Sequence, residues 1–402
     1  MEGRTCSLLA STFILCFLVT CSSKNLNITT DQTSLLALKS CIINLEPSHI
    51  LTQNWSTPSN VCTWIGVSCS RRHHRITALN ISNMGLKGTI PPHLGNLSFL
   101  VSIDMKGNSF QGNLPVELAQ LRRLRFLDLS SNTFTGQIPA SLGFLSEIQG
   151  LSLKNNNFSG IIPATIFNLS KLEMLDLSFN SLRGKLPEEI GKLQNLKDLS
   201  IQDNQLTGSI PFELYNVSGL ERLVLTRNSL SGELPDDICG RLPGLEGIYL
   251  SWNAISGRIP VSFPECRRLT LLSLSNNAFV GPIPRQIGNV TMLDTLYLGA
   301  NNLTVAAKAN CRQPLGRKEL RRPRRPDLGN ALSFLGDRGR QDRGESPSPK
   351  LGDGDSPIIL GNRSPRSPHP LSCSGRRRHR LKVGQRWSPP LLKQRLAVAA
   401  FS

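Results

Sequence analysis

Short hydrophobic runs recur along residues 76–304, and one polar residue follows each run at a fixed distance. A representative run reads Leu124-x-x-Leu127-x-Leu129-x-x-Asn132-x-Phe134-x-Gly136-x-Ile138-Pro139. The Leu-x-Leu pair alternates with period two, which predicts a short strand in every repeat. Ten positions, called here the asparagine ladder, share a 24-residue register with a single step of 25 residues. They are Met84, Asn108, Asn132, Asn156, Asn180, Asn204, Asn228, Asn253, Asn277 and Asn301.

This frame is the leucine-rich repeat, in the Gly-x-Ile-Pro form typical of plant extracellular proteins. One coil cannot bury its own leucines, so neighbouring coils must stack into a solenoid. We expect ten repeats over residues 76–304, with a parallel β-sheet along the concave face. Each ladder asparagine is expected to satisfy buried backbone groups with its amide, and the glycine four residues later to take a positive φ. We interpret Met84 as a variation at the end of the array.

The amino terminus carries a different hydrophobic run. It follows Arg4 and ends in small residues near Ser23, which predicts a secretory signal peptide over residues 1–23. A buried helix or a membrane anchor is the alternative, but the run is shorter than the roughly 20 residues that span a bilayer. Residues 24–75 are expected to form a helical, disulfide-bonded cap, in which Asp31 begins a helix as its N-cap.

Four cysteines are candidates for disulfide bonds. Cys62 and Cys69 flank a short loop of the cap, and a bond between them would close about eight residues and contribute roughly 2 to 3 kcal/mol. A zinc site is the alternative, but no second close cysteine or histidine pair completes it. Cys239 and Cys266 lie on the non-strand side of adjacent coils, so a second bond is also predicted. We expect no metal and no cofactor.

Asn-x-Ser/Thr sequons predict N-glycosylation of a secreted chain. They lie at Asn27, Asn54, Asn80, Asn96, Asn157, Asn168, Asn216, Asn289, Asn302 and Asn362. Four of these follow a ladder position by the same interval of twelve residues: Asn96, Asn168, Asn216 and Asn289. Their glycans are therefore expected on one flank of the solenoid, which we do not expect to be the main protein-binding face.

The repeat stops at Val305, where the tenth coil requires glycine. Residues 305–402 contain 22 Lys or Arg and 7 Asp or Glu, a net charge of +15 out of +18 for the whole chain. We expect a disordered basic tail or a non-native reading of the gene. Clustered arginines could neutralise nucleic-acid phosphates, but the signal peptide and the lack of interleaved aromatic residues argue against it. Contact with acidic pectin or a membrane surface rests on charge alone.

The cap motif Cys62-x-Trp64-x-Gly66-x-x-Cys69 leads into the ten Leu-x-Leu-x-x-Asn frames. Residues 24–304 thereby resemble the ectodomain of a plant leucine-rich-repeat receptor-like serine/threonine kinase, of the branch that contains the immune receptors for flagellin and elongation factor. The resemblance implies recognition of a peptide or protein ligand, a co-receptor kinase, a membrane-spanning helix and a kinase domain. After the signal segment no apolar run is long enough to span a membrane, and the glycine-rich, His-Arg-Asp and Asp-Phe-Gly kinase motifs are missing. We expect an ectodomain stopped before the transmembrane helix, without enzymatic activity of its own.

Outward positions of the strands do not pack, so ligand contacts are expected there. Most are small or polar, but bulky or charged residues cluster over coils five to ten. They are Phe179, Asp203, Arg222, Arg227, Tyr249, Trp252 and Tyr297, called here the candidate patch. Tyr, Trp and Arg dominate interface hot spots, which favours a binding surface. The alternative is that these side chains only cover the sheet edge or lie under a glycan.

Three functions are compatible with these features. The first is an extracellular recognition module in defence or developmental signalling, in the apoplast as written and at the plasma membrane as part of a full-length receptor. The second is a cell-wall enzyme inhibitor resembling polygalacturonase-inhibiting proteins, which end in a cysteine-bearing cap that this chain lacks. A basic patch on the concave face would favour the inhibitor. The third, a gene-model product without a function, cannot be separated from the first by sequence.

Overall fold

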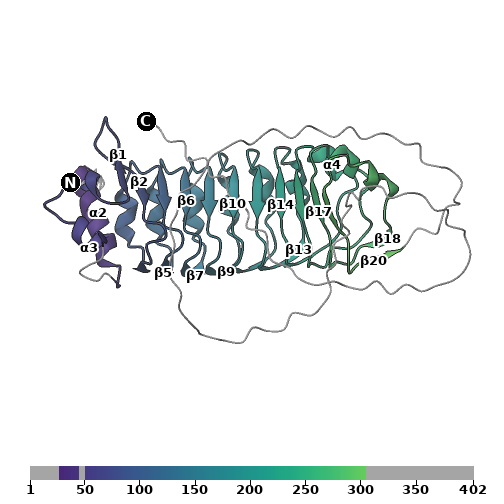
Figure 1. Ribbon diagram of the computed structural model, residues 1–402, viewed down its shortest axis with the longest axis horizontal. Helices are drawn as coiled ribbons and strands as arrows, with labels where there is room; N and C mark the ends of the chain where they lie inside the picture. Colours follow the sequence, from purple (N-terminus) through teal and green to yellow (C-terminus); the bar gives the residue numbers. More distant parts are fainter. Residues whose placement is uncertain (1–26, 45–49, 305–402) are drawn as a thin grey trace, which may run out of the picture.

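The computed structural model describes residues 27–44 and 50–304. The predictions for the signal peptide, for residues 305–402 and for the sequon at Asn362 lie outside the described residues. Figure 1 shows an elongated body of coils stacked side by side, from helices α2 and α3 at one end to strands β18 and β20 at the other. The predicted leucine-rich-repeat solenoid is confirmed. The helices of the cap are α2 (Ile28–Ser40), α3 (Ile50–Asn54) and η1 (Val61–Thr63).

One strand from each coil enters the predicted parallel sheet. The register places the central leucines of neighbouring strands side by side, as in Leu151, Leu175 and Leu199. All three are fully buried, so the inward side of this sheet forms the core. Strand β1 (Val67–Cys69) of the cap adds to the sheet in antiparallel orientation. The parallel strands are β2 (Ile76–Asn80), β4 (Ser102–Asp104), β6 (Phe126–Asp128), β8 (Gly150–Ser152), β10 (Met174–Asp176), β12 (Asp198–Ser200), β14 (Arg222–Val224), β16 (Gly247–Tyr249), β17 (Leu271–Ser273) and β19 (Thr295–Tyr297).

A second parallel sheet, which we did not predict, follows the ladder asparagines along another side of the solenoid (Figure 1). It ends at β15, and a separate pair of strands, β18 and β20, forms after a gap. Only the isolated bridges Glu233–Ser256 and Arg258–Val280 lie in that gap within the described residues. The strands are β3 (Lys87–Gly88), β5 (Ser109–Gly112), β7 (Thr133–Gln137), β9 (Asn157–Gly160), β11 (Ser181–Gly184), β13 (Gln205–Ser209), β15 (Ser229–Ser231), β18 (Val280–Pro282) and β20 (Asn302–Thr304).

The ladder asparagines connect each coil to the one before it. The Oδ1 of Asn132 accepts a hydrogen bond from the Phe110 N–H at 2.9 Å, and its Nδ2 donates to the carbonyls of Met105 and Leu129 at 3.0 and 3.1 Å. The predicted role of the asparagine amide is therefore confirmed. The glycines four residues after the ladder asparagines also take the predicted positive φ, for example 85° at Gly184.

Short helices, mostly 3-10, form the outer side. The four sequons with a common phase are each the last residue of one of these helices, so they occupy one structural position. A short α-helix, α4, replaces the 3-10 helix in the coil that is one residue longer. The helices are η2 (Pro92–Asn96), η3 (Val116–Gln120), η4 (Ala140–Phe144), η5 (Ala164–Asn168), η6 (Glu188–Lys192), η7 (Phe212–Asn216), α4 (Ile238–Arg241), η8 (Phe263–Glu265) and η9 (Arg285–Asn289).

The cap helix α2 begins differently from our prediction. Asn27 is its N-cap, and its Oδ1 accepts a hydrogen bond from the Thr30 N–H at 3.0 Å. The prediction that Asp31 caps this helix is wrong, because Asp31 lies inside the first turn and is fully buried. Its carboxylate accepts hydrogen bonds from Arg75 Nε and Nη2 at 2.8 and 2.7 Å and from the Ile76 N–H at 3.1 Å. Asp31 thus ties the cap to the first repeat strand.

Both predicted cysteine pairs are bonded. Cys62 and Cys69 are joined in the cap, and Cys239 of α4 is joined to Cys266 of the next coil. Cys41 is a free thiol. No group of His, Cys, Asp or Glu among the described residues is arranged to hold a metal ion.

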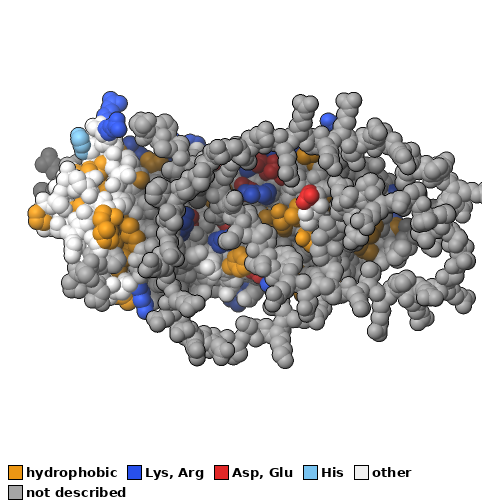
Figure 2. Space-filling view, in the orientation of Figure 1, with side chains coloured by type: hydrophobic (Ala, Val, Ile, Leu, Met, Phe, Trp, Pro, Cys, Tyr) orange, Lys and Arg blue, Asp and Glu red, His pale blue; other side chains and the backbone are white. Residues whose placement is uncertain are grey.

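The two ends of the solenoid differ in their surfaces. Lys and Arg side chains gather beside β1 at the amino-terminal end (Figure 2), where Arg71 and Arg72 are exposed. At the other end, Ile287, Leu293 and Leu303 are only partly buried against the core. None of the helices in the described part of the chain combines the length and the apolar character needed to cross a bilayer.

Candidate functional site

The structure divides the candidate patch into two parts. Only three of its residues lie in strands of the concave sheet: Arg222 in β14, Tyr249 in β16 and Tyr297 in β19. The other four directly precede a ladder asparagine, after the strand has ended: Phe179, Asp203, Arg227 and Trp252. Their assignment to outward strand positions is wrong, because the backbone turns left-handed there, with φ between 52° at Asp203 and 60° at Trp252. We call these four residues the left-handed row.

All ten coils have a left-handed residue at this point, and the other six coils fill it with small or turn-forming residues. These are Asn83, Gly107, Ser131, Asn155, Asn276 and Ala300. The left-handed conformation costs about 1–2 kcal/mol for a residue with a β-carbon, and Gly, Asn and Asp tolerate it best. Phe179, Arg227 and Trp252 therefore do not suit the backbone, and their side chains must explain their presence.

Side chains of the left-handed row contact one another from coil to coil. Arg227 Nη1 lies 3.6 Å from Asp203 Oδ1, and the Arg227 guanidinium carbon lies 5.8 Å from the centre of the Trp252 ring. Lys154 Nζ lies 5.7 Å from the centre of the Phe179 ring. Phe179 and Trp252 are 40% and 41% exposed. The row thus presents two accessible aromatic rings with an ion pair between them.

The strand part of the patch depends on two residues that sequence reasoning missed. Arg222 forms an ion pair with Asp198 of the preceding strand. A β-carbon at Gly247 would lie 2.7 Å from the Tyr249 ring, so the missing side chain makes room for that ring. Burial raises the pKa of Tyr249, while the nearby Arg222 acts in the opposite direction. Tyr297 lies two strands further along, at the same register position.

Charges on neighbouring coils are balanced over the concave face. Asp198–Arg222 and Asp203–Arg227 each pair residues 24 positions apart. The same spacing joins Glu173 to Lys197 at 2.7 Å. Opposite charges one repeat apart were the signal that could have found Asp198. Burial raises the pKa of Asp203 even though Arg227 lowers it.

These side chains can bind a ligand through ring faces, hydroxyls and paired charges. Comparison with known proteins agrees with the fold. The chain matches the Leucine rich repeat family over residues 146–206 and 218–279, a further Leucine Rich Repeat unit over 123–145, and the Leucine rich repeat N-terminal domain over 28–70.

Three similar proteins come from Arabidopsis thaliana. The LRR receptor-like serine/threonine-protein kinase EFR is 38% identical over 92 residues, which cover 23% of this chain and 9% of the relative. Polygalacturonase inhibitor 1 is 34% identical over 113 residues, 27% of this chain and 33% of the inhibitor. The ectodomain of the receptor kinase GASSHO1/SCHENGEN3, solved in complex with CASPARIAN STRIP INTEGRITY FACTOR 2, superposes with a TM-score of 0.64 at 38% identity, over 67% of this chain and 32% of that one.

The match to EFR spans less than a tenth of that receptor kinase's length. The match to the GASSHO1/SCHENGEN3 ectodomain likewise spans about a third of that chain. The chain therefore carries leucine-rich repeats and the N-terminal domain that precedes such repeats, and it is similar to the ectodomains of plant leucine-rich-repeat receptor kinases.

Proposed function

We propose that the solenoid is an extracellular recognition module of the plant receptor-kinase type, and that the candidate patch binds a peptide or protein ligand. The observation that carries this proposal is the left-handed row. Phe179, Arg227 and Trp252 occupy backbone positions that favour glycine or asparagine, and much of each side chain is exposed. Backbone strain of this kind is retained where the side chain has a function.

The dimensions of the patch favour an extended peptide over a small molecule. It reaches from Phe179 in coil five to Tyr297 in coil ten, and five strand spacings of about 4.8 Å give about 24 Å. An extended chain of about seven residues, at roughly 3.3 Å per residue, covers that length. The patch offers aromatic rings toward its ends and ion-paired polar groups between them. A ligand with apolar ends and a polar centre would match it.

The same proposal places the protein outside the cell. The predicted signal peptide, the sequons and the two disulfides support a secreted glycoprotein. By analogy with the related receptor kinases, the module would act in defence or developmental signalling, at the plasma membrane and with a co-receptor kinase when part of a longer receptor. The complex of the similar GASSHO1/SCHENGEN3 ectodomain supports ligand recognition by this type of solenoid.

Peptides selected on the full chain test the patch directly. We would select binders from a library of displayed linear peptides and measure their affinity for Trp252→Gly and Arg227→Gly. Each substitution removes a contact group and relaxes the left-handed turn, so affinity should fall at least tenfold while stability falls by no more than about 1 kcal/mol. Phe144→Gly is the control, because Phe144 is an exposed aromatic residue at the end of η4 on the outer side.

Two outcomes would count against the patch. Equal affinity of the selected peptides for all three variants and the parent would remove these residues from the site. A large loss of stability with unchanged affinity would give Trp252 and Arg227 a structural role only.

A cell-wall enzyme inhibitor remains the second candidate, because polygalacturonase inhibitor 1 is similar to this chain over 113 residues, the length of between four and five coils. The charge pattern does not favour it. Concave cations such as Lys197, Arg222 and Arg227 are each paired with a carboxylate, so they do not form a basic patch for acidic pectin. Inhibition of pectin hydrolysis by a purified fungal polygalacturonase, measured with and without an excess of this protein, would support the second candidate over the first.

A further inference from the structure

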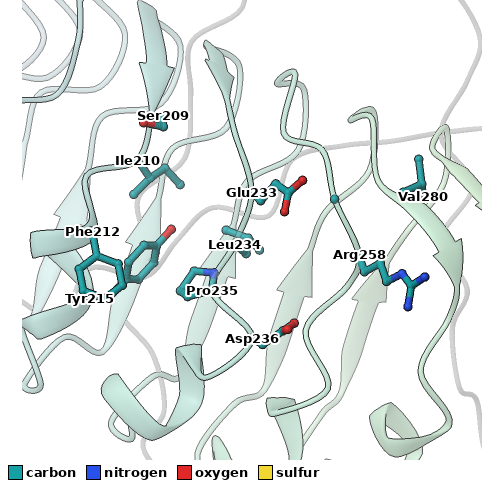
Figure 3. A pocket seen from close by; sticks show the side chains of 11 residues that line it. Ser209, Ile210, Phe212, Tyr215, Glu233, Leu234, Pro235, Asp236, Arg258 and Val280 are labelled. Carbon is teal, nitrogen blue, oxygen red and sulfur yellow. The ribbon is translucent and has the colours of Figure 1, made fainter.

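A pocket of about 760 Å³ lies away from the concave patch, at the gap between β15 and β18 in the second sheet (Figure 3). Residues of four consecutive coils line it, from Tyr215 of η7 to Val280 of β18. Pockets of this volume hold small ligands in other proteins. The candidate patch does not use any of its lining residues.

Two departures from the regular repeat coincide here. In four other coils the position of Tyr215 is a glycine, and at two of these, Gly95 and Gly143, a β-carbon would lie 2.3 Å from the backbone of the next coil. The coil that follows Tyr215 is the one with an extra residue and the short helix α4. Phe167 holds the same position in coil four, where the following coil has its regular length and the ring is fully buried. The pocket thus lies where a bulky side chain at this position is followed by a coil of irregular length.

The floor of the pocket contains a polar group without a partner. Tyr215 is 2% exposed, and among the described residues its hydroxyl has no hydrogen-bond partner. Burial raises its pKa above the usual range. Figure 3 shows the hydroxyl oxygen directed toward the part of the pocket that Ile210 and Leu234 line. Buried hydroxyls in folded proteins nearly always have a partner, so this one points to a neutral hydrogen-bonding group of a ligand.

The rim of the pocket is charged and available. Glu233, Asp236 and Arg258 are exposed, and none of the three forms an ion pair with another described residue. Glu233 folds over Gly257, where a β-carbon would lie 2.7 Å from its carboxylate carbon. The rim therefore offers two acceptor groups and one donor group, with a net charge of about −1 at neutral pH.

We propose that this pocket binds a neutral saccharide. A sugar hydroxyl donates and accepts at once, so it can satisfy the Tyr215 hydroxyl at the floor and both kinds of charged group at the rim. The C–H faces of a sugar ring match the apolar walls formed by Ile210, Leu234 and Pro235. A cationic ligand would have to lose its hydration against the apolar walls.

The saccharide can come from two sources. One is an external neutral oligosaccharide of the cell wall. The other is the N-glycan expected on Asn216, which closes the same helix η7 that carries Tyr215. Uronic-acid oligomers fit less well, because Glu233 and Asp236 outweigh Arg258 and leave the rim with a net negative charge.

Titration calorimetry of the glycosylated full chain with cellotetraose, and with tetragalacturonate as the charged probe of equal length, tests the proposal. We expect saturable binding of cellotetraose only. Tyr215→Phe should weaken it about fivefold to tenfold, the usual effect of one hydrogen bond, without lowering the unfolding temperature. Tyr249→Phe is the matched control, because it removes a tyrosine hydroxyl from the concave face and should leave cellotetraose affinity unchanged.

The glycan state separates the two sources. Binding by the glycosylated chain assigns the pocket to an external oligosaccharide. Binding that appears only in Asn216→Gln, or only after enzymatic removal of the N-glycans, assigns it to the chain's own glycan. Absence of binding in every form, equal binding of tetragalacturonate, or full affinity in Tyr215→Phe would overturn the proposal.

Discussion

Asn156 hydrogen-bonds two consecutive coils together, so its replacement by alanine measures what one ladder position contributes. Its Oδ1 accepts a hydrogen bond from the Phe134 N–H at 3.0 Å. Its Nδ2 donates to the Leu129 carbonyl of the preceding coil at 3.0 Å and to the Leu153 carbonyl of its own coil at 3.1 Å. The side chain lies in the core, and Asn156 is only 7% exposed.

The expected loss of unfolding free energy depends on which backbone groups lose their only hydrogen bond. The Leu129 and Leu153 carbonyls each keep a second hydrogen bond, from Asn132 and Asn180, both at 3.1 Å. The Phe134 N–H keeps none within the described residues. An orphaned buried N–H costs about 2 kcal/mol and each lost carbonyl bond about 1 kcal/mol, so Asn156→Ala should lose about 4 kcal/mol of unfolding free energy.

Urea denaturation followed by circular dichroism gives the free energy, and amide hydrogen exchange gives its location. Since each coil contacts only its neighbours, protection should fall first in coils three to five, at Phe134 above all. Asn113→Ala is the control, because Asn113 is exposed and its side chain makes no hydrogen bond to a described residue. A loss of less than about 1 kcal/mol, or equal to that of the control, would refute this account of the ladder.

Four further predictions concern other parts of the molecule. Burial raises the pKa of Asp203 from 3.8, so the folded protein binds its proton more tightly, and this contribution to stability is lost as the pH rises through the raised pKa. The melting temperature of Asp203→Asn should therefore exceed that of the parent protein at pH 7 and equal it at pH 3. A lower melting temperature of the variant at pH 7 would mean that the ion pair with Arg227 outweighs the cost of burial. Replacing both Cys239 and Cys266 by alanine should cost about 3–4 kcal/mol in urea unfolding, from a sequence separation of 27 residues. Glycan mapping of the secreted protein should find Asn216 occupied, and Asn54→Gln should lower the melting temperature, because Asn54 Oδ1 accepts from a backbone N–H.

The strands, the ladder and the positive-φ glycines could be predicted because the same contacts recur in every coil. One correct reading of Leu127, Asn132 and Gly136 therefore applies to the whole solenoid. The left-handed row could not be placed in the same way. Phe179 and Trp252 have residue types that favour strands, and only the three-residue length of the actual strands moves them into the turn.

Two other features depend on contacts that the repeat does not encode. Asp31 resembles a helix cap locally, yet its partner Arg75 is 44 residues away, directly before the first repeat strand, where burial makes the ion pair more important than capping. The pocket beside Tyr215 depends on how the longer coil packs against its neighbours. The sequence marks the place, through a 25-residue step, but not the opening that results.

Departures from the repeat have local effects because coils contact only their neighbours, and this can be tested with a double variant. Tyr215→Phe changes the pocket side and Trp252→Gly the concave edge, and the two residues share no hydrogen bond, ring contact or ion pair in the described structure. Their effects on unfolding free energy should add within about 0.5 kcal/mol. Trp252→Gly should also leave cellotetraose affinity unchanged, while Tyr215→Phe leaves peptide affinity unchanged. A coupling well above that limit would mean that the longer coil transmits strain between the two faces, and that they act as one site.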